Sequence, residues 1–119
     1  MERTDDFRLS IYLSQSIALS DTFGKLVGLK AGTIIDRYGS KWGTYTSPPG
    51  TPFEQRALPY DNNAWAYHRY EVIKDISDVT SSEIAPAFNQ PGGGIQYELP
   101  KSIKELIKDG FLKEIFFYD

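Results

Sequence analysis

One stretch of twelve residues decides how this chain folds: Asn89-Gln90-Pro91-Gly92-Gly93-Gly94-Ile95-Gln96-Tyr97-Glu98-Leu99-Pro100. Three consecutive glycines are costly to order, so they suit a place where the backbone bends sharply or lies close to a ligand. In the short strand predicted after them, Ile95, Tyr97 and Leu99 share one face, and Ile95 and Tyr97 anchor the strand in the core. Gln96 and Glu98 share the other face. Two interpretations stay open here: a hairpin with a surface glutamine, or a groove lined by backbone beside Gln96.

The composition describes one ordinary globular domain. The chain has 119 residues, of which 40% are hydrophobic and 24% charged, and it is rich in aromatic residues, which favour sheet over helix. It contains no cysteine, which excludes disulfides, thiolate metal sites and cysteine nucleophiles. Neither an apolar run long enough to span a membrane nor a signal-peptide core behind the charged first residues is present.

The net charge of −3 argues against a nucleic-acid binder that acts through its overall field. The charge is uneven, however. Residues 25–56 contain five basic and two acidic side chains, a local balance of 5 − 2 = +3. A basic middle in an acidic protein fits a small anionic ligand, such as a phosphate ester, better than a long polyanion.

The order of predicted elements indicates an α+β fold with a mostly antiparallel or mixed sheet. A short helix after residue 102 is the clearest element, because Ser102 and Glu105 form a capping box and Gly110 occupies the position that ends a helix. We also expect a helix over 5–19, a helix or loop over 20–32, strands over 33–38, 42–46, 65–74, 95–99 and 111–118, a stiff proline loop over 47–52 and a polar, turn-rich segment over 75–89.

Candidates for chemistry are few. With one histidine, no cysteine and no carboxylates at ligand spacing, the sequence predicts no metal site, and it has no Gly-x-Ser-x-Gly turn, P-loop or dinucleotide fingerprint. A scattered polar set remains at strand ends and glycine or proline loops: Arg37, Tyr45, Arg56, His68 and Gln96. Arginine suits bidentate binding of phosphate. Each member taken alone is equally compatible with a surface ion pair or with packing.

The chain resembles the tuberculosis necrotizing toxin family through six blocks that occur in the family's order. They are residues 36–45 (DRYGSKWGTY), 47–59 (SPPGTPFEQRALP), 67–72 (YHRYEV), 84–86 (IAP), 90–97 (QPGGGIQY) and 106–115 (LIKDGFLKEI). The blocks span most of the chain, and their combination is far more specific than any one of them. Residues 1–30 carry no part of the resemblance, and the segment 60–64 departs from the family's pattern without touching the blocks.

The resemblance implies an enzyme that hydrolyses NAD, often NADP too, to nicotinamide and the ADP-ribose product, with no cofactor. It also implies a small twisted β-sheet core with flanking helices, distantly like ADP-ribosyltransferases. We expect a single domain over 1–119, with a helical N-terminal region over 1–30 and a catalytic core over 33–118. The family's catalytic residues fall on Gln96, Arg37, Tyr45 and His68, and its substrate-binding residues on Arg56, Ser47, Pro48, Gly50, Gly92, Gly93 and Gly94.

The resemblance further implies a toxin that is secreted or delivered by contact as the C-terminal part of a larger protein. It would act in the cytoplasm of the target cell, as a monomer, and a cognate immunity protein would block its active site. Two rival activities stay open. An ADP-ribosyltransferase would use a carboxylate near the reacting sugar, for which Glu98 is the candidate, and a ribonuclease toxin would use His68 with Arg37 or Arg56.

Overall fold

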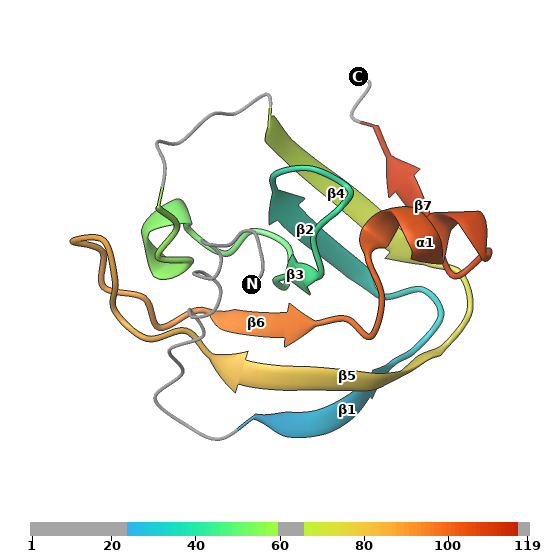
Figure 1. The fold of residues 1–119 in the computed structure, drawn as a ribbon, viewed down its shortest axis with the longest axis horizontal. Coiled ribbons are helices and arrows are strands. Elements are labelled where there is room, and N and C mark those ends of the chain that lie inside the picture. The colour runs from blue at the N-terminus through green and yellow to red at the C-terminus, as the bar shows by residue number, and fades with distance from the viewer. Residues whose placement is uncertain (1–23, 60–65, 117–119) are drawn as a thin grey trace.

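The computed structural model describes residues 24–59 and 66–116, so the helix expected over 5–19 lies outside the described residues. Seven strands, a short 3-10 helix and one α-helix follow one another along the chain (Figure 1). They are β1 (Lys25–Leu29), β2 (Ile34–Tyr38), β3 (Tyr45–Thr46), η1 (Phe53–Gln55), β4 (Tyr67–Val72), β5 (Ile76–Glu83), β6 (Ile95–Glu98), α1 (Ile103–Lys108) and β7 (Leu112–Ile115). The expected mostly antiparallel sheet structure with a short C-terminal helix is confirmed.

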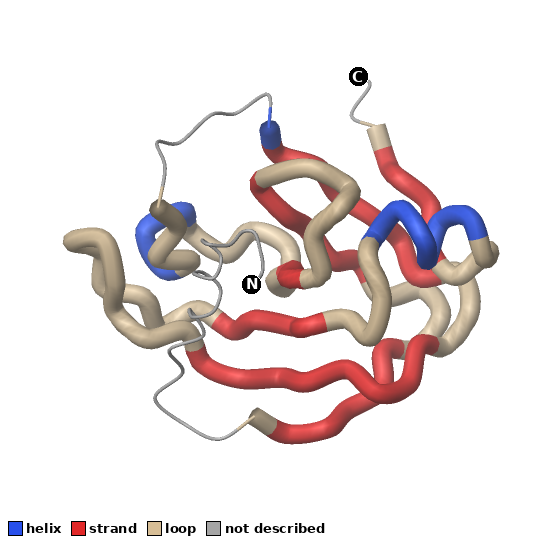
Figure 2. The backbone as a smooth tube through the Cα atoms, in the orientation of Figure 1, coloured by secondary structure: helices blue, strands red, loops and turns tan. Residues whose placement is uncertain are grey.

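The strands form two antiparallel sheets that meet at one corner (Figure 2). One sheet has the order β1-β5-β6-β3, and the other has the order β2-β4-β7. The corner is made by Asp36 of β2 and Ser47, just after β3. Each donates its backbone N–H to the carbonyl of the other at 2.9 Å. This junction brings the ends of β2, β3 and β6 together, and the functional site is built there.

Two sequence predictions about strands were wrong. Residues 25–29 form β1 rather than helix or loop, and the segment expected to be turn-rich contains β5, the longest strand. The reason is a bulge: β1 pairs Val27 with Val79 and Leu29 with Ile76, so one residue on β1 faces two on β5. Asp78 takes a positive φ of 60° within the bulge. The two buried residues of β5 therefore lie three positions apart, which hides the period-two pattern of a strand.

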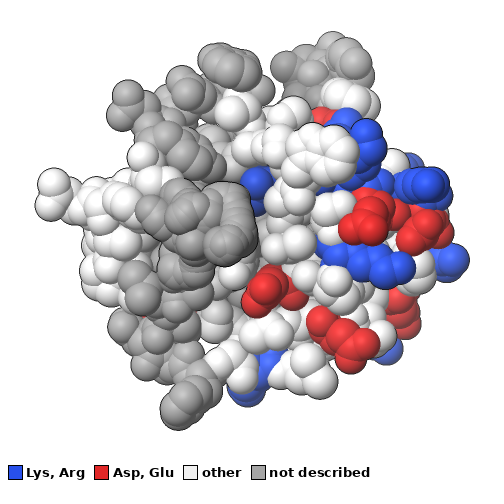
Figure 3. All heavy atoms as spheres, viewed as in Figure 1, with Lys and Arg blue, Asp and Glu red and all other residues white. Residues whose placement is uncertain are grey.

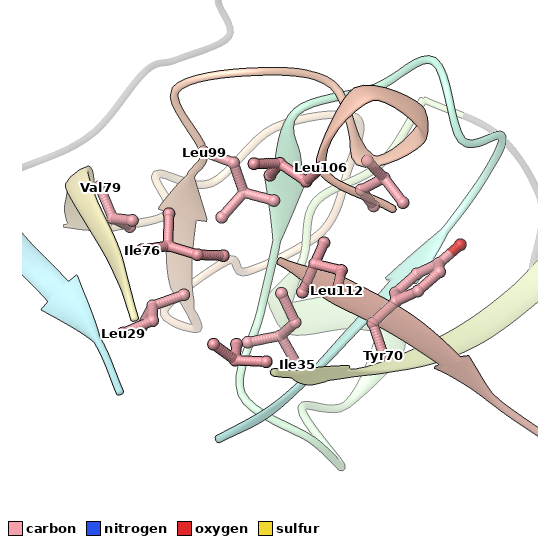
Figure 4. Packing of buried hydrophobic residues seen from close by; sticks show 10 residues of the cluster. Leu29, Ile35, Tyr70, Ile76, Val79, Leu99, Leu106 and Leu112 are labelled. Carbon is pink, nitrogen blue, oxygen red and sulfur yellow. The ribbon is translucent and has the colours of Figure 1, made fainter. Parts of the chain in front are cut away.

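The apolar core fills the space between the two sheets and α1 (Figure 4). Its buried members are Leu29, Ile35, Tyr70, Val72, Ile76, Val79, Leu99, Ile103, Leu106 and Leu112. The prediction that Ile95 anchors β6 in this core was wrong, because Ile95 is 39% exposed. Tyr97 packs against the cluster and Leu99 is buried, so these two residues hold β6 in place.

Helix α1 has the predicted capping box, which confirms its start. The Ser102 hydroxyl accepts a hydrogen bond from the Glu105 backbone N–H at 3.1 Å, and the Glu105 carboxylate accepts one from the Ser102 N–H at 3.3 Å. The first N–H groups of the helix donate to carbonyl groups of the loop between β2 and β3. The Ile103 N–H donates to the Gly43 carbonyl, and the Lys104 N–H donates to the Lys41 carbonyl. The helix therefore fixes this loop as well as covering the core.

Charged side chains intermix on the face of the molecule where α1 lies, without a patch of one sign (Figure 3). The basic excess of residues 25–56 is likewise divided: Lys30 pairs with Asp75, and Lys41 pairs with Glu114. Within residues 24–59 and 66–116, no helix is long and apolar enough to cross a membrane.

Candidate functional site

A small polar pocket lies at the corner where the two sheets meet. It contains about 320 Å³ of space, part of which is open solvent. Its lining comes from β2, β3, β6 and the segments beside them: Asp36, Arg37, Tyr38, Tyr45, Thr46, Ser47, Arg56, Leu58, Ile84 and Gln96. Four of the five polar residues isolated from the sequence therefore meet in one place, although they are spread over 60 positions of the chain.

Gln96 and Tyr45 reach the pocket from paired strands. Gln96 lies in the middle of β6, opposite Ser82 of β5, and Tyr45 pairs with Glu98 two residues further along β6. Gln96 is half-buried, and its amide has no hydrogen-bond partner in the described part of the chain. A side-chain amide can both donate and accept hydrogen bonds, so the Gln96 amide is suited to a ligand with hydroxyl groups.

Arg37 is braced by the glycine-rich loop between β2 and β3. Its Nε donates to the Ser40 carbonyl at 2.8 Å, and its Nη1 donates to the Tyr45 carbonyl at 3.0 Å. The guanidinium lies so close to Gly43 that any side chain at that position would overlap it. The glycine therefore makes room for the arginine, and the bonds fix the positive charge at the pocket wall.

Asp36 and Arg56 form a buried ion pair at the wall of the pocket. Arg56 Nη1 lies 2.8 Å from Asp36 Oδ1, and Arg56 Nη2 donates to Asp36 Oδ2 at 3.0 Å. The Tyr67 hydroxyl donates to the same Oδ2 at 2.7 Å, and the Arg56 guanidinium stacks over the Tyr38 ring at 4.9 Å. Burial, followed by the bond to Asp36 and its charge, raises the pKa of Tyr67. Arg56 Nε donates to the Thr51 carbonyl at 2.9 Å, so the guanidinium is held on three sides.

The predicted proline loop packs over this ion pair. Ser47 is buried and lines the pocket, whereas Pro48 and Gly50 do not. The Gly50 N–H donates to Asp36 Oδ2 at 3.1 Å, and the Thr51 hydroxyl donates to the Pro48 carbonyl at 2.8 Å. Gly50 has a φ of 81°, a backbone conformation that favours glycine.

The three glycines before β6 join the hairpin to η1 instead of lining the pocket. The N–H groups of Gly92, Gly93 and Gly94 all donate to protein carbonyls, those of Glu54, Ile84 and Gln55 respectively. A Cβ on Gly92 would lie 2.6 Å from the Ile84 carbonyl oxygen, and one on Gly94 would lie 2.8 Å from the Thr51 methyl group. Close packing explains Gly92 and Gly94, whereas Gly93 has open space around it and a positive φ of 94°. Their contact with a substrate stays a prediction.

His68 lies outside the pocket, in a second polar cluster on the three-stranded sheet. Its Nδ1 is 2.7 Å from Glu114 Oε2, and Lys41 Nζ is 2.9 Å from Glu114 Oε1. Burial raises the pKa of Glu114, but the hydrogen bonds and charges of Lys41 and His68 together lower it more, so the pKa lies below its ordinary value. His68 is the cross-strand partner of Arg37, and this pairing links the cluster to the pocket.

Glu98, the carboxylate on the same face of β6 as Gln96, does not line the pocket. Glu98 as a whole is exposed, but its carboxyl group is partly buried. This burial raises the pKa of Glu98, and a hydrogen bond with Tyr45 lowers that pKa to a smaller extent. No group of three or more histidine or acidic side chains suited to a metal ion occurs within residues 24–59 and 66–116.

Sequence reasoning missed the buried carboxylate of the site. Asp36 was noted only as a charge and as part of the DRYG block, yet it is 0% exposed and connects Arg56, Tyr67 and the proline loop. A signal was present, because an aspartate directly after two β-branched residues in a strand is unusual and requires a buried partner. The apolar lining residues Leu58 and Ile84 left no signal of their own.

Comparison with known proteins agrees with the sequence blocks. The family model described as tuberculosis necrotizing toxin matches residues 28–115. A conidial surface nicotinamide adenine dinucleotide glycohydrolase of Aspergillus fumigatus is 37% identical over 94 residues, which cover 73% of this chain and 40% of that protein. The outer membrane channel protein CpnT of Mycobacterium tuberculosis is 33% identical over 95 residues, 70% of this chain and 11% of that protein.

A solved structure supports the same relation. The tuberculosis necrotizing toxin in complex with its immunity factor superimposes with a TM-score of 0.54 and 29% sequence identity, over 74% of this chain and 54% of that one. The chain thus spans less than half of each curated relative named here. Because the family model covers most of the chain, the chain belongs to the tuberculosis necrotizing toxin family.

Proposed function

We propose that this domain is an NAD glycohydrolase toxin, which hydrolyses the bond between nicotinamide and ribose and so depletes NAD in a target cell. The family relation to a protein named as an NAD glycohydrolase carries the proposal. The pocket supports it, because a fixed cation, a tyrosine and an unoccupied amide surround one small polar space.

The chemistry of the bond explains why an amide suffices at the centre of the site. Cleavage passes through an oxocarbenium-like transition state, for which ordinary glycosidases use one carboxyl group as acid and another as base or nucleophile. In NAD the nicotinamide ring is a cationic pyridinium, and it departs as neutral nicotinamide. The leaving group therefore needs no general acid. We assign Gln96 to the hydroxyl groups of the reacting ribose, where it acts by positioning and by hydrogen bonds that strengthen in the transition state.

The other residues of the site hold the substrate. Arg37 lines the pocket, and two hydrogen bonds fix its guanidinium, which suits it to the pyrophosphate of a dinucleotide. Tyr45 and Ser47 line the same pocket as Gln96 and Arg37. His68 supports this pocket from the neighbouring strand through its position opposite Arg37.

The setting of the activity follows from the same relatives. We propose that the domain, with its catalytic core over residues 33–118, acts at the C-terminal end of a larger exported protein. One mycobacterial relative is an outer membrane channel protein, and the fungal relative is a conidial surface protein. We also propose that an immunity protein inhibits the domain, as the solved toxin is bound to its immunity factor.

Incubation of the purified domain with NAD labelled in the adenylate tests the proposal. We expect stoichiometric release of nicotinamide and free ADP-ribose, with NADP tested in parallel. Label that ends on protein in a cell extract would instead identify an ADP-ribosyltransferase. Intact NAD together with degraded RNA would identify a ribonuclease.

A further inference from the structure

The buried carboxylate of Asp36 is the most heavily used polar group behind the pocket. Its Oδ2 accepts hydrogen bonds from Arg56 Nη2, the Tyr67 hydroxyl and the Gly50 N–H at 2.7 to 3.1 Å, and its Oδ1 lies 2.8 Å from Arg56 Nη1 in the ion pair. Its side chain is 0% exposed, and that of Arg56 is 5% exposed. A buried charge is tolerated only when it is paired and hydrogen-bonded, so this arrangement has a narrow range of geometries.

The groups that Asp36 holds are parts of the pocket or are joined to it. Arg56 lines the pocket, and the Gly50 N–H belongs to the loop that begins with Ser47. The backbone pair between Asp36 and Ser47 fixes the start of the same loop. Immediately after Arg56, Ala57 is buried with a positive φ of 49°. Such a strained alanine persists only where its surroundings hold it, and the bonds of Arg56 supply that restraint.

We propose that Asp36 is a positioning residue of the active site, which acts through Arg56 and through the loop of residues 47–50. This inference rests on the proposed hydrolase activity. It also changes the expected role of Arg56. The guanidinium makes an ion pair and one hydrogen bond with an unexposed carboxylate and donates to the Thr51 carbonyl, so its charge is already neutralised by Asp36. Arg56 thus shapes the pocket, and Arg37 is the arginine that meets the substrate's phosphates.

Loss of a positioning residue should lower turnover more than it weakens substrate binding. Tyr67→Phe is the mildest test, because it removes one hydroxyl, which donates to Asp36 and is also hydrogen-bonded with Arg69, and it keeps the ring against Tyr38. We expect kcat to fall about tenfold, as for loss of one hydrogen bond to a charged group, while KM changes less than about twofold. An unchanged kcat in a folded Tyr67→Phe protein would overturn the proposal.

A double-mutant cycle tests whether Asp36 acts through Arg56. Asp36→Asn and Arg56→Met should each lower kcat by about a hundredfold. The double variant should lose no more than the single variants, because the two residues act as one unit, and it should be the better folded since it leaves no unpaired buried charge. Losses in kcat that multiply would show two independent roles and would overturn the proposal.

Amide hydrogen exchange separates this inference from the proposed function. In Tyr67→Phe the Gly50 N–H should exchange about tenfold faster. The Phe111 N–H, which follows α1 and donates to the Leu106 carbonyl, should exchange at an unchanged rate and serves as an internal reference. If the wild-type domain released no nicotinamide, the hydrolase proposal would fail, and the Gly50 rate would still report the restraint. An unchanged Gly50 rate would overturn the role of Asp36 in either case.

Discussion

Two clusters of acidic and basic side chains lie on the three-stranded sheet, and they differ mainly in their access to water. In the first, Asp36 and Arg56 have side chains that are 0% and 5% exposed. In the second, Glu114 is 11% exposed, but His68 is 31% and Lys41 is 46% exposed. Water therefore screens the second cluster much more than the first. The buried pair of Asp36 and Arg56 therefore restrains the pocket tightly, whereas the exposed cluster of Glu114, His68 and Lys41 makes only weak contacts at the surface.

The largest expected effect on stability comes from the first cluster. Asp36→Asn leaves the charge of Arg56 buried and unpaired, which should lower the free energy of unfolding by about 3–5 kcal/mol. Urea unfolding measures the change, with Glu114→Gln as the matched variant of the second cluster. A similar loss in both variants would remove the contrast between the two clusters.

The hairpin behind the pocket offers a second contrast, between neighbouring glycines. Gly92→Ala places a methyl group 2.6 Å from the Ile84 carbonyl oxygen at a φ of 67°, and we expect a loss of about 2–4 kcal/mol. Gly93→Ala meets no atom within 4 Å and should cost about 1–2 kcal/mol, from its positive φ alone. Thermal unfolding of the two variants tests this order, and equal losses would mean that close packing does not explain Gly92.

A smaller effect, below about 1 kcal/mol, is expected from the second cluster, and it depends on pH. The pKa of Glu114 is lowered from its ordinary value of 4.5 in the folded protein. Its contribution is therefore complete above about pH 4.5 and disappears as the pH falls through the lower folded pKa. Stability curves of wild type and Glu114→Gln should converge in acid. Curves that stay parallel down to pH 3 would contradict this assignment.

The smallest effect is expected at Tyr70, whose ring lies in the core with its hydroxyl directed away from the apolar cluster (Figure 4). In the described part of the chain this hydroxyl has no hydrogen-bond partner. Burial and the nearby Glu114 charge raise its pKa to about 12. Tyr70→Phe should change stability by less than about 0.5 kcal/mol at neutral pH. A loss above about 1.5 kcal/mol in urea unfolding would reveal a bond to this hydroxyl.

The fold was predictable from sequence wherever a local signal was undisturbed. The capping box of Ser102 and Glu105 located α1, and the alternation of side chains after the glycines located β6. Strands were also expected where β2 and β4 lie. The bulge at Asp78 broke that alternation in β5. On β1, Gly28 and the 72% exposed Leu26 gave no regular pattern of buried residues.

The site was predictable in its members more than in its geometry. Arg37, Tyr45, Arg56 and Gln96 meet in the pocket, whereas His68, opposite Arg37 in the three-stranded sheet, lies outside it. The sequence also did not reveal that Arg56 forms an ion pair with Asp36, because the two residues are 20 positions apart and their contact is tertiary.

Nicotinamide release by wild type and Gln96→Ala, measured side by side, tests the central claim most directly. We expect the wild type to hydrolyse NAD and Gln96→Ala to lose at least about 10²-fold in kcat, as for one transition-state hydrogen bond of about 3 kcal/mol. Glu98→Gln is the matched control, on the same face of β6 but outside the pocket, and should stay within about twofold of wild type. Equal activity of Gln96→Ala and wild type, or loss of activity in Glu98→Gln alone, would contradict the assignment of Gln96 to the reacting ribose.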